Sequence, residues 1–339
     1  MRNTLSMTRR WTSRFARCSV RCVLITFVFL PLVVQAQQDS KSRSLKSLSF
    51  KSPIISLSID GDQKRIFAGS GSTVHVFDAE LKPVSKLQTE MAFVCDILCD
   101  GKLLYVAGGD PAEHGMVELH ELDGDKGFKL LKRKITHQDV IHSVAKNFAG
   151  HLLTASADAK ILMHTAKSIS LAGVFEHHSK RVTVVESIPG LDLVVSGGLD
   201  DTIRVWASDD RTKPIRTLTN HQDDILDIQC FVDDSEDENS PLPMVATVSR
   251  DRTVRFWQPT IGRMIRFKKL DRVPSVCCWI PKTRKVLVGC DDGKILEISS
   301  QTLEIREIYD LKQPVFSLRT MGSSTVLVGG RNRLVMTNF

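Results

Sequence analysis

Two stretches of this sequence decide its fold: Val194-Val-Ser-Gly-Gly-Leu-Asp-Asp-Thr-Ile-Arg-Val-Trp206 and Val245-Ala-Thr-Val-Ser-Arg-Asp-Arg-Thr-Val-Arg-Phe-Trp257. Each consists of an apolar segment, a short turn that contains Asp, and an alternating segment that ends in Trp. Alternation of apolar and polar residues with a period of two is typical of half-buried β-strands, and Asp favours turns. Both stretches therefore predict the same strand–turn–strand unit.

Weaker copies of this unit recur through the rest of the chain, at 67–77, 106–119, 153–164, 287–298 and 327–336. The turn position falls at intervals of 39 to 51 residues, at Gly71, Asp110, Asp158, Asp200, Asp251, Asp292 and Asn332. Each unit has a further strand upstream and room for a fourth, whereas the turns of a sandwich would not recur in register. The sequence predicts an all-β fold, a seven-bladed β-propeller with four-stranded antiparallel blades.

The two ends of the predicted propeller complement each other. The chain ends at Phe339, directly after the third strand of the last unit, so this blade lacks a fourth strand of its own. The segment 44–50 alternates as a strand before the first full unit. We expect this N-terminal strand, about residues 43–50, to complete the last blade and remove its free edge.

The first 36 residues differ from the rest, because they hold six Arg, no acidic residue and a 13-residue apolar run, 22–34. This run is too short to cross a hydrocarbon core of about 30 Å, and Val34 and Ala36 are small residues suited to a cleavage site. We interpret 1–36 as a secretory signal peptide and 37–339 as one propeller, exported to the periplasm or secreted. After cleavage no stable membrane span remains; an uncleaved membrane anchor is the alternative.

The leader also explains the net charge. The whole chain has 46 Lys and Arg against 39 Asp and Glu, a formal charge of +7. Removal of the six leader arginines leaves a charge of about +1. Basic stretches remain at 129–134 and 263–269, but they are ordinary for exposed strands. The basic pI therefore does not predict a nucleic-acid partner.

The recurring His, Ser or Thr, Asp and Trp positions resemble the WD-repeat β-propeller family over residues 41–339. In that family these four side chains form a hydrogen-bonded structural tetrad. The resemblance implies complete tetrads in units 4 and 5 and an incomplete one in unit 3, where His164 replaces Trp. The residues are His178, Ser196, Asp200 and Trp206, then His221, Thr247, Asp251 and Trp257, then His137, Thr154 and Asp158. Units 1, 2, 6 and 7 lack most of the set, so we expect apolar packing to hold them.

No pattern in the sequence predicts catalysis: there is no Gly-x-Ser-x-Gly, no His-Glu-x-x-His and no complete dinucleotide loop. We predict no catalytic residues, no cofactor and no metal. Two weaker patterns are interpreted as surface features. One comprises Asp110, Glu113, His114 and His120 around the longer turn of unit 2, which could alternatively hold a metal. The other, Asp233-x-Ser235-x-Asp237-x-Asn239, lacks the central Gly and the Glu of a calcium loop.

Six cysteines follow the leader, all within apolar strand patterns: Cys95, Cys99, Cys230, Cys277, Cys278 and Cys290. Cys95 and Cys99 are about 13 Å apart along one strand, too far for a disulfide. We expect buried free thiols. Pairing of Cys290 with Cys277 or Cys278 is the alternative, because an exported protein meets oxidising conditions.

The resemblance also implies a function and a surface. In the family the residue before the turn Asp lies on the usual partner-binding face, which implies five candidates here: Ala157, Leu199, Arg250, Asp291 and Arg331. This mixture is neither uniformly basic nor apolar, and it favours a protein or peptide partner. We predict a monomeric, non-enzymatic interaction platform. The alternative is a lactonase- or quinoprotein-like propeller enzyme with an axial metal or cofactor.

Overall fold

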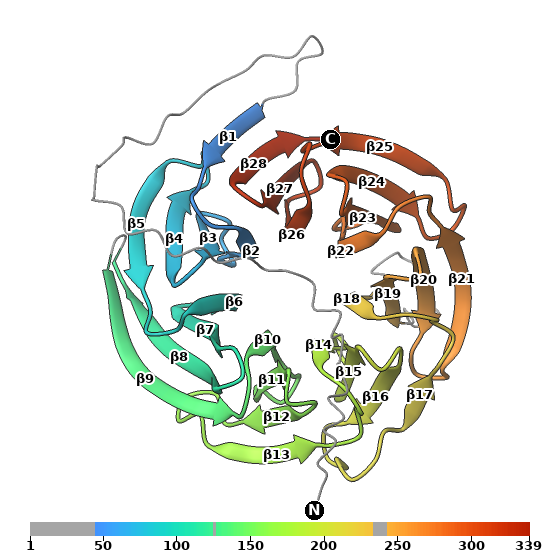
Figure 1. Cartoon of the computed structure of the whole chain (residues 1–339), viewed down its shortest axis with the longest axis horizontal. Coiled ribbons are helices and arrows are strands. Elements are labelled where there is room, and N and C mark those ends of the chain that lie inside the picture. Colours follow the sequence, from blue (N-terminus) through green and yellow to red (C-terminus); the bar gives the residue numbers. More distant parts are fainter. Residues whose placement is uncertain (1–44, 125–126, 233–242) are drawn as a thin grey trace, which may run out of the picture. The chain divides into compact units, whose positions relative to one another are not determined.

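The computed structural model describes residues 45–124, 127–232 and 243–339. All regular secondary structure in these ranges is β-strand, in seven four-stranded antiparallel sheets around an axis (Figure 1). The prediction of a seven-bladed β-propeller is confirmed. The predicted signal peptide lies outside the described residues. Within these ranges, no helix has the length and apolar character needed to cross a membrane.

Each of the first six blades consists of four consecutive strands, with the first at the axis and the fourth at the rim (Figure 1). Blade 1 contains β2 (Ile54–Ile59), β3 (Arg65–Ser70), β4 (Thr73–Asp78) and β5 (Pro83–Gln88). Blade 2 contains β6 (Phe93–Asp100), β7 (Leu103–Asp110), β8 (His114–Asp123) and β9 (Gly127–His137). Blade 3 contains β10 (Ile141–Lys146), β11 (Leu152–Ser156), β12 (Ile161–His164) and β13 (Leu171–Phe175).

The second half of the ring repeats this pattern. Blade 4 contains β14 (Val182–Ser187), β15 (Leu193–Gly198), β16 (Ile203–Ala207) and β17 (Arg216–Leu218). Blade 5 contains β18 (Ile225–Val232), β19 (Pro243–Ser249), β20 (Thr253–Gln258) and β21 (Arg263–Lys269). Blade 6 contains β22 (Pro274–Trp279), β23 (Lys285–Cys290), β24 (Lys294–Ser299) and β25 (Ile305–Asp310). Blade 7 contains β26 (Val315–Met321), β27 (Thr325–Gly330), β28 (Arg333–Asn338) and, from the other end of the chain, β1 (Leu45–Ser49).

The closure of the ring by β1 is confirmed. Strand β1 pairs antiparallel with β28, from Leu45 opposite Thr337 to Ser49 opposite Arg333. Leu48, which is 2% exposed, packs in one apolar cluster with residues of blades 1 and 7. The two chain ends thus share one sheet, and no edge of β28 is left free for intermolecular pairing.

The hydrophobic core lies between neighbouring blades rather than within any one of them. One apolar cluster joins the sheets of blades 3 and 4 around Trp206, and another joins blades 5 and 6 around Phe256. Close approach of the blades explains a recurring glycine: a Cβ added at Gly197 would lie 2.5 Å from Ile225 of the next blade, and one at Gly289 would lie 2.5 Å from Val315. The Gly of Val-Ser-Gly-Gly is therefore a packing requirement.

Every innermost strand carries a register irregularity after its first or second residue. These irregularities lie at Ile54/Ser56, Val94/Asp96, Ile141/Ser143, Val182/Val184, Ile225/Asp227, Pro274/Val276 and Val315/Ser317. A β-bulge changes the direction in which the following side chains point. Two carboxylates, Asp96 and Asp227, come directly after such a bulge and line the axis.

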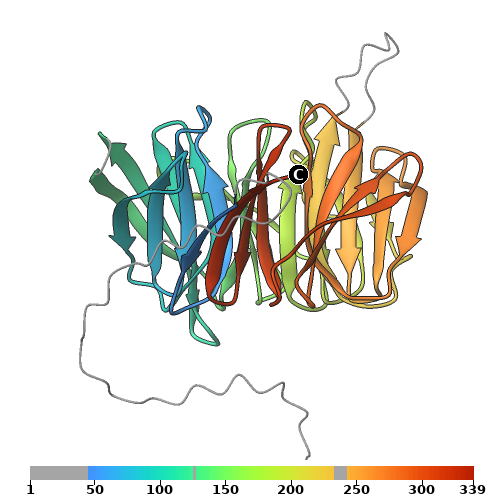
Figure 2. The ribbon, with the colours of Figure 1, turned by 90° about the horizontal axis from the view of Figure 1, so that it is seen from above.

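The strands run between the two faces of the ring (Figure 2). One face, which we call the Asp-turn face, carries the turns between the second and third strands of each blade, such as 199–202 and 250–252. Each of these turns lies beside the start of an innermost strand: the amide of Leu199 donates to the carbonyl of Arg181 (2.9 Å), and that of Arg250 to Asp224 (3.0 Å). The other face, the opposite face, carries the turns that follow the innermost strands, such as 147–150 and 188–192.

Candidate functional site

Four side chains of blade 4 form one continuous hydrogen-bonded chain under the Asp-turn face. His178 Nδ1 lies 3.0 Å from the Asp200 carboxylate, and its Nε2 lies 2.8 Å from Ser196 Oγ. Trp206 Nε1 donates to the same hydroxyl at 2.9 Å. Because an ionised carboxylate only accepts hydrogen bonds, we assign the proton to Nδ1, so that Ser196 donates to Nε2 and accepts from the indole. All polar atoms of this buried set thereby have partners.

Blade 5 repeats this geometry. His221 lies 2.8 Å from both Asp251 Oδ2 and Thr247 Oγ1, and Trp257 Nε1 donates to Thr247 Oγ1 at 2.9 Å. Thr247 and Trp257 are almost completely buried. The residues that the resemblance selected are therefore structural neighbours in both blades.

Blade 3 completes the same set with a second histidine. His137 lies 2.9 Å from Asp158 and 2.8 Å from Thr154 Oγ1. His164 takes the place of Trp and reaches Thr154 Oγ1 with its Nε2 at 3.2 Å. Burial, together with the nearby His137 and Lys134, lowers the pKa of His164 to about 4, so this imidazole is neutral at physiological pH.

The tetrads fix the turn aspartates on the Asp-turn face. Burial opposes ionisation of Asp251, but hydrogen bonds from Thr253 and His221 outweigh it and lower the pKa of Asp251 to about 2. The ionised carboxylate also accepts from the backbone amide of Gln222 at 3.2 Å, in the loop before β18, the innermost strand of the same blade. The conformation of this turn is therefore fixed by charge-assisted bonds from two segments.

These hydrogen-bonded sets coincide with matches to a known family. The WD40 family, described as "WD domain, G-beta repeat", matches residues 169–207 and 212–258, which contain the strands and turns of both complete tetrads. The chain belongs to the WD-repeat β-propeller family. Propellers of this family typically bind other proteins and generally act as scaffolds without enzymatic activity.

Several curated WD-repeat relatives are similar over part of the propeller. Probable cytosolic iron-sulfur protein assembly protein 1 of Kluyveromyces lactis is 28% identical over 143 residues, 39% of this chain and 40% of that protein. WD repeat-containing protein 18 of Danio rerio is 23% identical over 177 residues, 50% of this chain and 40% of that protein. The U5 small nuclear ribonucleoprotein 40 kDa protein of Dictyostelium discoideum is 33% identical over 102 residues, 30% of this chain and 28% of that protein. The chain thus matches two fifths or less of the length of these relatives.

The five predicted contact residues all lie on turns of the Asp-turn face. Arg250, Asp291 and Arg331 are exposed, whereas Ala157 and Leu199 are half-buried. They surround the axis from blades 3 to 7, and their neighbours include both signs of charge. Arg250 Nε, for example, donates to Asp224 at 3.0 Å. These five positions stay predicted contacts.

Blade 2 contains a buried polar set that the sequence analysis missed. Glu118 is fully buried, lies 2.9 Å from His120 Nε2 and accepts from Arg133 Nε at 2.9 Å. Burial opposes its ionisation, but the bonds from His120, the Glu90 amide and Arg133 outweigh it and lower the pKa of Glu118. Apolar packing holds this blade as expected, and the buried polar set is an addition that was not expected. The sequence signal for this polar set was an acidic residue and a His two positions apart in an otherwise apolar strand.

The proposed turn cluster of unit 2 is only partly assembled. The ligand atoms of Asp110, Glu113 and His114 lie within 4.8 Å of one another, whereas His120 is separate and bound to Glu118. A second such group, Asp201, Asp223 and Asp224, lies on the turns of blades 4 and 5. Partly exposed groups of this kind are common without an ion. The acidic segment 233–239 lies outside the described residues.

All six cysteines of the propeller are free thiols. Cys277, Cys278 and Cys290 are buried, as expected, but Cys95, Cys99 and Cys230 are only partly buried. Burial is the main cause that raises the pKa of Cys95 and of Cys290 to about 12, so neither forms a reactive thiolate at neutral pH.

Described residues line two cavities at the axis that the sequence analysis did not anticipate. A cavity of about 550 Å³ extends to the opposite face, and a smaller one of about 120 Å³ lies toward the Asp-turn face. Asp96, Glu186 and Arg319 line both cavities and so lie at their junction. Asp227 lines the smaller one. Charged residues inside otherwise apolar innermost strands were the signal for this site.

The axial carboxylates have unusual protonation equilibria. Burial raises the pKa of Glu186 to about 8, and the nearby Asp227 and Asp96 add to this effect while Arg319 opposes it. Burial raises the pKa of Asp227 to about 6, against hydrogen bonds such as that from the Cys277 amide. Among the described residues, no three acidic, His or Cys ligand atoms converge within 4.8 Å at the axis.

Proposed function

We propose that this protein is a non-enzymatic interaction platform that binds a protein or peptide on its Asp-turn face outside the cytoplasm. The observation that carries the proposal is the coupling of the tetrads to this face. In blades 3, 4 and 5 a buried His holds the turn aspartate, and the residue before that aspartate is presented beside the axis. A rigid surface binds without the entropic cost of ordering its loops.

The composition of the surface supports a protein partner. Arginines that can desolvate against a partner are frequent in protein interfaces, and this face presents Arg250 and Arg331 among acidic and apolar neighbours. Two relatives are named for assemblies, one as an iron-sulfur protein assembly protein and one as a small nuclear ribonucleoprotein protein. By analogy, we propose that the present chain also acts within an assembly, as a monomeric subunit.

Export rests on residues 1–36 alone. Six arginines followed by the 13-residue apolar run and Ala36 have the order of a cleavable secretory signal. N-terminal sequencing of the protein from its native cells should begin at Gln37. Retention of Met1 would argue against cleavage and, in a cytosolic fraction, against export.

The partner surface is tested by crosslinking and affinity capture from the native cell envelope. The double variant Arg250→Ala/Arg331→Ala should recover at least about tenfold less of the specific partner than the unmodified protein, the loss expected for one or two interface hot spots. Lys129→Ala/Lys132→Ala, on the exposed rim strand β9, is the charge-matched control and should capture normally. Equal capture by both double variants would exclude this face.

A further inference from the structure

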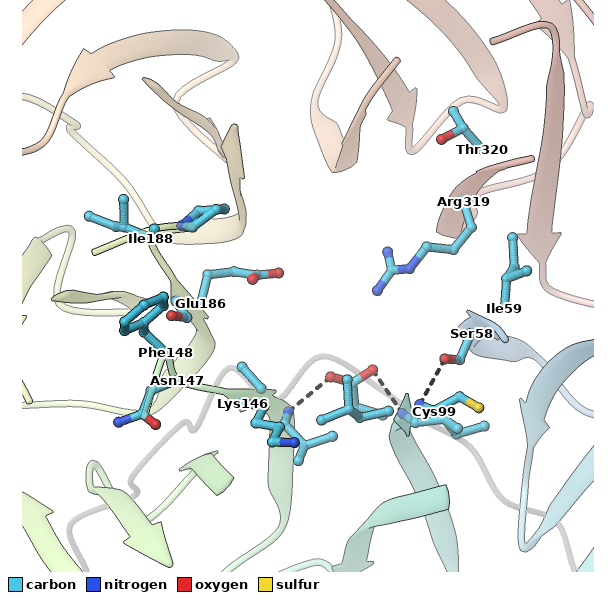
Figure 3. Close-up of a pocket in the computed structure, with 18 residues that line it drawn as sticks. Ser58, Ile59, Cys99, Lys146, Asn147, Phe148, Glu186, Ile188, Arg319 and Thr320 are labelled. Carbon is cyan, nitrogen blue, oxygen red and sulfur yellow. Dashed lines mark hydrogen bonds between the residues drawn. The ribbon is translucent and has the colours of Figure 1, made fainter. Parts of the chain in front are cut away.

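An acidic and a basic side chain face each other across the larger axial cavity without forming an ion pair. Figure 3 shows Glu186 and Arg319 pointing into the cavity from opposite walls, one from β14 and the other from β26. No carboxylate oxygen of the described residues lies within 4.0 Å of the Arg319 guanidinium. The cavity thus separates two groups that would otherwise attract each other.

Both groups have unused hydrogen-bonding capacity. Arg319 donates from Nη1 to the carbonyl of its neighbour Leu318 at 2.9 Å, and its guanidinium has five N–H donors in all. Glu186 accepts from Gln229 Nε2 at 3.1 Å, although its carboxylate has room for about four bonds. Arg319 is half-buried, so the donors of its guanidinium that make no bond remain available to an acceptor in the cavity.

The other two axial acids, Asp96 and Asp227, differ from Glu186 because backbone amides already donate hydrogen bonds to their carboxylate oxygens. Asp96 accepts from the amides of Ile97 and Val144 at 2.9 Å each and from the Ser56 hydroxyl at 3.1 Å. Asp227 accepts from the amides of Ile228 and Cys277 at 2.8 and 2.9 Å. These two residues join neighbouring innermost strands. They also contribute negative potential at Glu186.

We propose that the larger axial cavity binds a free α-amino acid, with its carboxylate on Arg319 and its ammonium on Glu186. A lone cation would face Arg319, and a lone anion would face two acidic side chains, Asp96 and Glu186. A zwitterion places each of its charges beside the opposite one. The cavity volume of about 550 Å³ lies within the range of about 300–1,000 Å³ that is usual for small-molecule sites.

The mouth of the cavity indicates the kind of amino acid. On the opposite face it is lined by Ile59, Ile188 and Pro189, and by Phe148, whose side chain is highly exposed (Figure 3). Lys146 also lies at the mouth, but it forms an ion pair with Asp100. An apolar side chain would lie against these residues and shield Phe148 from water.

The proposal predicts a pH dependence of binding. The groups around Glu186 are Arg319 on β26, Asp96 on β6, Asp227 and Gln229 on β18, and the thiols of Cys230 and Cys277. An ammonium beside Glu186 favours its ionised form, so binding releases a proton whenever the free site is protonated. Affinity should therefore rise as the pH increases toward about 8, where free Glu186 loses its proton.

Isothermal titration of the purified protein tests the ligand class without any mutation. Leucine should give saturable binding. Isoamylamine, which lacks the carboxylate, and 4-methylpentanoate, which lacks the ammonium, should each bind at least about tenfold more weakly. Equal binding of either analogue, or no saturable binding of leucine at about 10 mM, would overturn the proposal.

Two single substitutions then test whether Glu186 and Arg319 bind the amino acid. Glu186→Gln and Arg319→Gln should each weaken leucine binding at least about tenfold, and Glu186→Gln should also remove the rise in affinity with pH. Glu176→Gln and Arg333→Gln, at exposed positions, are the matched controls and should bind leucine normally. If Arg319→Gln melts like the unmodified protein and binds leucine equally well, the assignment of Arg319 is wrong.

Discussion

Blades 4 and 5 differ from blades 6 and 7 in what lies at the same four positions. Ser196 and Thr247 come directly before the position that Gly197 and Gly289 occupy in their blades. At their own position, they accept hydrogen bonds from Trp206 and Trp257. The residue at this position in blade 6 is Val288, which is also completely buried. At the Trp position blade 6 has Ile298, paired with Val286 as Trp206 is paired with Val194. The two pairs of blades have the same strand topology.

This difference separates two contributions to the fold. The strand pattern and the packing of neighbouring blades are common to all seven sheets, so they specify the propeller. The tetrad occurs in some blades only, so it stabilises a turn and presents its aspartate. Blade 2 provides a third arrangement with Glu118, His120 and Arg133. Glu118 has its hydrogen bonds in this set, whereas the buried Nδ1 of His120 has no partner among the described residues.

The largest effect on stability should come from loss of the closing strand β1, because every blade depends on a closed ring. Removal of residues 41–50 deprives β28 of its partner and Leu48 of its buried site. The melting temperature should fall by about 10 °C or more. Removal of residues 37–40 serves as the control and should leave it unchanged. A truncated protein with the original melting temperature would contradict closure by β1.

Two opposite substitutions, one that removes the hydroxyl of blade 5 and one that adds a hydroxyl to blade 6, test this difference between the blades. Thr247→Val leaves the indole N–H of Trp257 and Nε2 of His221 without a partner, and should cost about 2–4 kcal/mol in the free energy of unfolding. The reverse change, Val288→Thr, buries a hydroxyl among apolar side chains and should cost about 1–3 kcal/mol. Urea denaturation measures both values. A stabilising Val288→Thr would show that the blades do not differ as described.

Blade 3 has His164 where blades 4 and 5 have Trp, and this difference should affect how stability depends on pH. His164 has its pKa lowered from 6.5 to about 4 by burial, His137 and Lys134, so the unfolded chain binds a proton at higher pH than the folded protein. Its contribution is complete above pH 6.5 and is lost as the pH falls toward 4. His164→Gln should therefore lose less stability between pH 7 and pH 5 than the unmodified protein, by on the order of 2 kcal/mol.

Urea denaturation of the unmodified protein and of His164→Gln, at pH 7 and at pH 5, measures this difference in lost stability. Burial also lowers the pKa values of His75, His142 and His221 to about 4, and these three residues contribute the same acid sensitivity to both proteins. Identical losses in the two proteins would mean that His164 is protonated without cost in the folded state.

The smallest effect on stability should come from the predicted contact residues. Arg250 and Arg331 are exposed, and the ion pair of Arg250 with Asp224 is at the surface. Such pairs contribute about 0–1 kcal/mol. Arg250→Ala/Arg331→Ala should therefore melt within about 2 °C of the unmodified protein. A larger shift would assign these residues to the fold rather than to a partner.

Much of the fold was predictable because its determinants are local and repeated. The turn Asp and the Trp recur at fixed spacing, and the loop His residues mark the starts of β10, β14 and β18. The alternating segment before the first unit correctly predicted β1. The fourth strands, such as β17 with its three residues, carried no comparable pattern of their own.

The axial site was not predictable in the same way. Asp96, Glu186, Asp227 and Arg319 come from four different blades, and only the closed ring brings them to one cavity. The polar set of blade 2 was missed because Glu118 and His120 replace the expected residue types within one strand. Repeated patterns predict what all blades share, whereas these sites depend on single substitutions.

The central claim, that the Asp-turn face binds the partner, is tested most directly by site-specific photocrosslinking in the native cells. A photoreactive residue in place of Leu199, on the Asp-turn face, should give one specific adduct with the partner. The same residue in place of Phe148, on the opposite face, should give none of that adduct. Adducts from position 148 together with none from position 199 would contradict the claim.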